Sequence, residues 1–169
     1  MQALAAGELV LEPLVPGHAE AMFEVLGDPE LYRYLDHPPP PSVEHLRDVY
    51  AGVETRMSPD ASQAWLNWVV RRPGQPLLGY VQATVLPDHM AWVGYVFSVR
   101  HWGRGHATHA VRAMLEHVAR DYGVSRFLAS VEAANQRSIR LLERLGFHEA
   151  GAPEAQAHAL SDTERLFVK

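Results

Sequence analysis

The feature that most constrains this chain is a glycine-spaced turn, Arg-His-Trp-Gly-Arg-Gly-His-Ala-Thr, at residues 100–108. An apolar, strand-like run (92–99) precedes it, and a run with apolar side chains at every third or fourth position (107–122) follows it, as in an amphipathic helix. A turn that joins a strand to a helix exposes unpaired N–H groups at the positive end of the helix dipole. Gly103 and Gly105 lack the Cβ that would keep an oxyanion away from the backbone. The turn therefore predicts a phosphate or pyrophosphate site.

Two common phosphate-binding loops do not fit this turn. A P-loop needs Lys followed by Ser or Thr after its last glycine, where this chain has His106-Ala107. The dinucleotide-binding fingerprint needs a third glycine, where this chain has Thr108. The spacing that remains, Arg-x-x-Gly-x-Gly, also arises by chance, and a plain turn without a ligand is the alternative.

A second motif makes the interpretation more specific. Asn135-x-x-Ser138 follows a strand-like run and opens a helical run that ends in Leu-Gly-Phe at residues 145–147. Together, the two motifs resemble the GCN5-related N-acetyltransferases (GNAT), in their RimJ/RimL-like branch. Residues 8–14 and 28–32 also resemble this branch, so the likeness spans most of the chain. It is strong over residues 93–147 and loose over residues 37–72.

The order of predicted elements agrees with that family's fold. Strand-like runs at 64–71, 77–86 and 91–99 are joined by short turns, which predicts an antiparallel meander. Strand, helix and strand between residues 91 and 131 predict a parallel pair with a right-handed crossover. The resemblance implies one domain over residues 1–169. It is an α/β fold whose mixed, mostly antiparallel central sheet has about six to seven strands, a V-shaped splay and helices on both faces.

The resemblance also implies an activity and a set of ligand-binding residues. The protein would move acetyl from acetyl-CoA to a primary amine, either a protein or peptide N-terminus or a small amine, in a ternary complex. The acyl-CoA would be held by the backbone near the end of the central strand, by the loop and by the second motif: Phe97, Val99, Arg100, Gly103, Arg104, Gly105, Ala107, Thr108 and Asn135. Asn135 also stands where a helix N-cap belongs, and that role alone would account for it.

The catalytic groups are less well defined than the loop. Many relatives carry a tyrosine as general acid four residues before the Gly-Phe pair, and this chain has Leu142 there. Ser138 is therefore the leading acid, with water as the alternative. Relatives often carry Glu at the positions of Trp92 and His109.

The general base stays open between His109, His89, Glu132 and a water. The absent proton-handling side chains also leave a second function class open, a non-catalytic acyl-CoA-binding sensor.

Composition excludes several other classes. The chain has no cysteine, so neither a disulfide nor a cysteine nucleophile is available. A net charge of -5 without a long run of like charges does not suggest nucleic acid or an anionic membrane as partner. His106 and His109 lie one helical turn apart but lack a nearby carboxylate, so no metal is expected.

No apolar run approaches the roughly 20 residues of a membrane span, and the N-terminus does not resemble a signal peptide, so the cytoplasm is the expected location. The loosely similar region up to residue 72 would line the acceptor pocket. The sequence does not identify the acceptor amine, the oligomeric state (monomer or homodimer), or whether other acyl groups are used.

Overall fold

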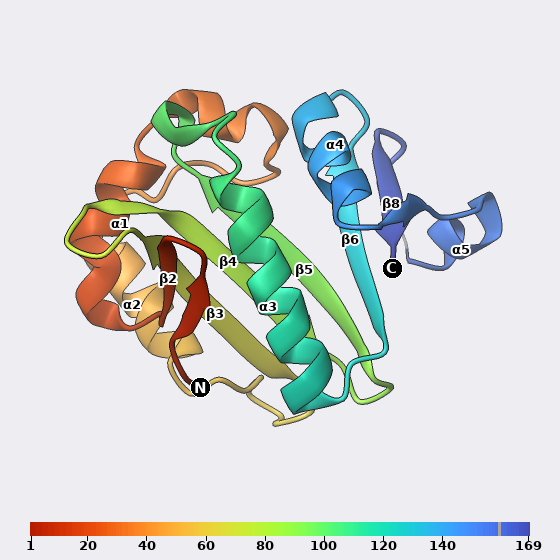
Figure 1. The fold of residues 1–169 in the computed structure, drawn as a ribbon, viewed down its shortest axis with the longest axis horizontal. Coiled ribbons are helices and arrows are strands. Elements are labelled where there is room, and N and C mark those ends of the chain that lie inside the picture. The colour runs from red at the N-terminus through yellow and green to blue at the C-terminus, as the bar shows by residue number, and fades with distance from the viewer. Residues whose placement is uncertain (159) are drawn as a thin grey trace.

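The computed structural model describes residues 1–158 and 160–169, which form one mixed sheet flanked by helices (Figure 1). The strands are β1 (Leu4–Ala6), β2 (Leu9–Pro13), β3 (Ala64–Arg71), β4 (Leu77–Val85), β5 (Met90–Phe97), β6 (Arg126–Glu132), β7 (His148–Glu149) and β8 (Glu164–Val168). The α-helices are α1 (Ala19–Leu26), α2 (Val43–Val53), α3 (His106–Tyr122), α4 (Gln136–Arg144) and α5 (Ala152–Ala157). Short 3-10 turns are η1 (Pro16–His18), η2 (Pro29–Tyr34) and η3 (Val99–His101).

The strands run in the order β1-β2-β3-β4-β5-β6-β8-β7. All neighbours are antiparallel except β5 and β6, which α3 connects as a parallel pair. That pair is joined only over Met90–Trp92 and Arg126–Leu128. Beyond these residues the two strands diverge toward their carboxyl ends, as Figure 1 shows. The predicted V-shaped splay is therefore present at the centre of the sheet.

Side-chain alternation along the central strands builds two cores. On β3, Leu66, Trp68 and Val70 face α3 and α4, whereas Val69 faces the opposite side, where α1 and α2 pack. The same period of two continues on β4 and β5, because successive side chains of a strand point to opposite faces. Helices thus cover both faces of the sheet, and the predicted fold class is confirmed.

The structure differs from the sequence-based expectation in its edge elements. The sheet has eight strands instead of six to seven, because β1 and β7 each add a short edge strand. β1 folds onto β2 through a tight turn at Gly7, whose φ is 65°. Helix α2 ends at Val53. None of the described helices is both long and apolar enough to cross a membrane.

Candidate active site

The glycine-spaced loop connects the end of β5 to the start of α3. Gly103 and Gly105 have φ angles of 74° and 80°, in the left-handed region that glycine adopts without strain. Nothing lies within 4 Å of a Cβ placed on either residue, so the loop faces open space. Gly105 is the N-cap of α3, and Arg100 and Arg104 beside it are exposed. The loop therefore has two free cations and room for an anion against its backbone.

The backbone of this loop has a row of unused donors. Within the part of the chain that the structure describes, the six N–H groups from Gly103 to Thr108 donate to no protein acceptor, and the first bond of the helix is His109 N–H to the Gly105 carbonyl. Their partial positive charge adds to the dipole of the 17-residue helix α3. Six consecutive donors at a helix start form an oxyanion site of the kind that binds phosphate groups.

The splay provides a second set of free backbone groups. The Met90 carbonyl accepts the Leu86 N–H, and the Ser98 N–H donates to the Leu78 carbonyl, so both residues bond on the β4 side of β5. Backbone groups of successive residues in a strand point to opposite sides, so the odd-numbered residues between them direct their N–H and C=O groups toward β6. After Trp92 no strand of the described residues meets these groups. An extended ligand could therefore pair with the backbone of Val93 and Tyr95, and with the N–H of Phe97, as an added strand would.

The end of β5 lies earlier than the sequence suggests. The Trp102 indole folds back and donates from Nε1 to the Phe97 carbonyl at 2.7 Å. Val99 begins the short turn η3, and its carbonyl accepts the Trp102 N–H at 3.2 Å. The carbonyls of Phe97 and Val99 are therefore both bonded within the protein, and Phe97 has only its N–H left for a ligand in the splay.

A cavity of about 120 Å³ lies inside the splay and brings both sequence motifs together. Phe97 and Ala107 line it from one side, and Asn135 and Ser138 line it from the first turn of α4. The two motifs are about thirty residues apart in the chain, so only the fold joins them. Sequence reasoning missed further lining side chains, which come from η2, β5, the loop and α4: Leu31, Tyr34, Tyr95, Val96, Trp102, Arg137 and Leu141.

Tyr95 is the most informative of the missed residues. Its Oη lies 2.6 Å from Ser138 Oγ, so the two hydroxyls share a short hydrogen bond across the splay. Burial raises the pKa of Tyr95 to about 12, although its bond to Ser138 opposes part of this shift. The phenol therefore stays protonated at neutral pH and can donate to the serine.

Asn135 has the structural role that its position suggested. Its Oδ1 accepts the Ser138 N–H at 3.2 Å, which caps α4. The cap leaves the amide N–H₂ group of Asn135 available to a ligand in the cavity, and it leaves Ser138 Oγ to Tyr95. Capping and ligand binding are thus compatible in one side chain.

Trp102 and Arg137 line this cavity from the loop and from α4, and they stack on each other. The guanidinium carbon of Arg137 lies 3.6 Å from the centroid of the Trp102 ring, which is cation–π contact. The indole is itself held by its bond to Phe97. The stacked pair bridges the glycine-spaced loop and α4, and it places a positive charge beside the cavity.

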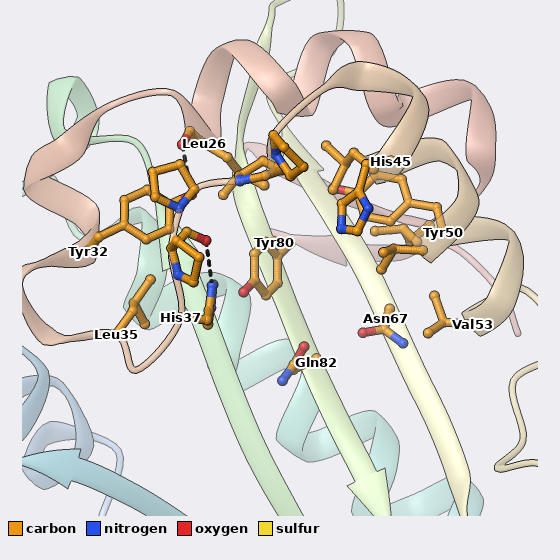
Figure 2. A pocket seen from close by; sticks show the side chains of 17 residues that line it. Leu26, Tyr32, Leu35, His37, His45, Tyr50, Val53, Asn67, Tyr80 and Gln82 are labelled. Carbon is orange, nitrogen blue, oxygen red and sulfur yellow. Dashed lines mark hydrogen bonds between the residues drawn. The ribbon is translucent and has the colours of Figure 1, made fainter.

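A larger cavity of about 390 Å³ lies on the face of the sheet that α1 and α2 cover, under these helices and the segment between them (Figure 2). Asn67, Tyr80 and Gln82 form its floor on β3 and β4, as Figure 2 shows. The two cavities share a wall. Tyr32 and Leu35 line the larger one, while Leu31 and Tyr34, from the same short segment, line the smaller one.

The candidate bases are not brought together. His89 lies in the turn before β5, at the opposite end of that strand from the splay, about 20 Å from Tyr95 at 3.3 Å per residue. His109 is exposed on the first turn of α3 and lines neither cavity. Glu132 ends β6 at the splay, where its Oε1 accepts a bond from Thr163 Oγ1 at 3.1 Å.

The structure shows no metal site in the described residues, among which no three His, Cys, Asp or Glu side chains cluster in a way that could hold an ion. His106 is buried with 4% exposure and faces Glu8, whereas His109 is exposed, so the two histidines do not share a ligand position.

Comparison with known proteins agrees with the fold. Residues 8–148 match the family model described as "Acetyltransferase (GNAT) domain". The chain is 25% identical over 153 residues to the protein named "Uncharacterized N-acetyltransferase p20" of Bacillus licheniformis, covering 89% of this chain and 85% of that protein.

Two solved structures share the fold. The ribosomal L7/L12 α-N-protein acetyltransferase RimL, solved in complex with coenzyme A, superposes with a TM-score of 0.82 at 19% identity, over 99% of this chain and 97% of that one. RimJ of Mycobacterium smegmatis, solved with CoA-disulfide, gives 0.79 at 20% identity, over 99% and 85%.

The family match spans most of the chain, from the second strand to the end of the second motif. The chain therefore belongs to the GNAT acetyltransferase family, and it is an enzyme of the acetyltransferase class. The RimJ/RimL-like character inferred from the two motifs agrees with these structural neighbours.

Proposed function

We propose that this protein transfers acetyl from acetyl-CoA to a primary amine, with both substrates bound at once in the two neighbouring cavities. The pyrophosphate lies on the six free N–H groups between Gly103 and Thr108, with Arg100 and Arg104 as counter-charges. The pantetheine arm enters the splay and pairs with the backbone of β5 next to Asn135. The thioester then reaches Ser138, and the amine approaches from the larger cavity.

The observation that carries this proposal is the bond between Tyr95 and Ser138 inside the splay. In the transfer, the amine nitrogen attacks the thioester carbonyl carbon, the carbon–sulfur bond breaks, and the departing thiolate takes a proton. Ser138 Oγ supplies that proton, and Tyr95 Oη donates to Ser138 Oγ and turns its O–H toward the sulfur. Tyr95 is thus a positioning residue, and Ser138 regains its proton from solvent.

Proximity supplies much of the remaining rate. Holding an activated thioester and an amine in line replaces a bimolecular encounter by an intramolecular step. The ammonium proton leaves through water, and Glu132 at the mouth of the splay is the nearest of the candidate bases. The proton donor at Ser138 favours an enzyme over an acyl-CoA sensor, because a sensor has no use for it.

A thiol-release assay with acetyl-CoA and a panel of amines and short peptides tests transfer. Amine-dependent release above the uncatalysed rate is expected, and tight acetyl-CoA binding without any such release would leave the sensor as the function.

A matched pair of variants tests the loop. Gly105→Val places a branched side chain over the free N–H groups and should weaken acetyl-CoA binding at least tenfold by calorimetry. Gly74→Val, at a turn with a similar φ of 72° and equally open surroundings, imposes the same backbone strain away from the loop and should leave binding unchanged. Equal acetyl-CoA affinity in the two folded variants would refute the loop as the pyrophosphate site.

A further inference from the structure

The larger cavity has a chemical character that limits what it can accept. Of the described residues that line it, none is Asp, Glu, Lys or Arg. Apart from His37 and His45, its walls are apolar or aromatic, and one wall is the segment of four successive prolines at residues 38–41. Its volume of about 390 Å³ lies in the range of small-molecule sites.

Neutral hydrogen-bonding groups are the main polar feature inside it. Tyr80, Asn67 and Gln82 come from the sheet floor (Figure 2), and Tyr50 comes from α2. The amides of Asn67 and Gln82 and the hydroxyl of Tyr80 therefore offer a ligand donors and acceptors that carry no charge.

A ligand that carries a second positive charge, in addition to its reacting amine, meets no counter-ion in this cavity. A polyamine or an aminosugar with several ammonium groups would lose water from each of them and meet no carboxylate in return. The reacting amine itself escapes this cost, because it loses its proton as it meets the thioester. An aromatic or branched skeleton, in contrast, gains from contact with the tyrosine, leucine and proline walls.

A peptide chain is a poorer match than a small molecule. The proline wall has no N–H groups, so it offers a peptide backbone no donors along residues 38–41. The cavity's remaining donors are a few separate side chains instead of a strand edge.

We infer that this cavity takes a small primary amine on an aromatic or branched apolar skeleton, with one neutral hydrogen-bonding group and no second charge. The inference rests on the proposed function, because it takes the reacting group to be an amine.

Two probes that differ only at one ring position test this selectivity. Tyramine has a neutral hydroxyl there, and 4-(aminomethyl)phenethylamine has a second ammonium. With CoA-loaded protein, calorimetry is expected to give at least tenfold tighter binding of tyramine. With acetyl-CoA, thiol release is expected to give at least a tenfold higher kcat/KM for tyramine.

A charge placed on the cavity floor should change the preference. Asn67→Asp adds a carboxylate with almost no change of shape, and it should bring the ratio of the two probes to near one or reverse it. Gln75→Glu makes the same charge change at an exposed position in the turn between β3 and β4, and it should leave the ratio as it is.

The outcomes separate the two claims. Equal or tighter binding of the doubly charged probe, or binding only of peptides with a free N-terminus, would overturn the inference and leave acetyl transfer intact. Selective binding of tyramine without thiol release from acetyl-CoA would instead refute the proposed transfer and leave the selectivity of the cavity standing.

Discussion

Replacing Tyr95 by phenylalanine removes a single oxygen from the splay and keeps the ring in place. The lost group is one end of the 2.6 Å bond to Ser138 Oγ. A hydrogen bond between neutral groups contributes about 1 kcal/mol, which is about fivefold in rate. Without its partner, Ser138 also samples its three staggered rotamers, so the productive one falls to roughly a third of the population. Together these effects predict a loss of about 5- to 15-fold in kcat.

Steady-state thiol release measures this effect, and the KM for acetyl-CoA should change less than twofold because the ring still packs in place. Tyr122→Phe removes a hydroxyl at the far end of α3 and should leave kcat unchanged. The decisive comparison is the double variant. If Tyr95 acts only through Ser138, then Tyr95→Phe should cost nothing further in a Ser138→Ala background. Losses that multiply in the double variant, or an unchanged kcat in Tyr95→Phe, would refute the positioning role.

Three other predictions concern stability and pH. A Cβ on Gly79 would lie 2.1 Å from the backbone oxygen of Val96. Gly79→Ala should therefore lower the free energy of unfolding, measured by urea denaturation, by roughly 3 kcal/mol. Gly17→Ala, where a Cβ would meet open space, should change it little. His109→Gln should keep the acid limb of the pH profile of kcat/KM, because His109 lines neither cavity. Loss of this acid limb in the variant would identify His109 as the base. Burial raises the pKa of Tyr80 to about 12 in the folded state, whereas the unfolded chain titrates near the ordinary value of about 10. The contribution of Tyr80 to the free energy of unfolding should therefore be constant below pH 10 and decrease from pH 10 toward pH 12. Phenolate absorbance of Tyr80 should appear only when the protein unfolds.

Local signals in the sequence predicted the parts of the site that depend on few residues. The glycine-spaced turn before α3, the cap at Asn135 and the end of α4 before Gly146 each follow from residue type and spacing. The central strands were found because each is a run of eight or nine mostly apolar residues bounded by a turn. A three-residue strand such as β1 is too short to form such a run, and its pairing comes from the partner strand.

The contacts that give the site its chemistry are long-range, which is why the sequence did not reveal them. Tyr95 and Ser138 are 43 residues apart in the chain. They meet because the diverging ends of β5 and β6 place β5 and the first turn of α4 on the two sides of one cavity. The end of β5 at Phe97 similarly depends on the Trp102 indole, whose folding back has no local signature. The identity of the general base lies in the same category, since it depends on how the acceptor amine is held.

The most direct test of the account is a crystal structure of the protein with acetyl-CoA bound. The account predicts pyrophosphate oxygens within hydrogen-bond distance of the N–H groups of residues 103–108. It also predicts the pantetheine arm along β5 in the splay and the thioester sulfur next to Ser138 Oγ. A pyrophosphate bound away from this loop, or a sulfur remote from the hydroxyls of Tyr95 and Ser138, would contradict it.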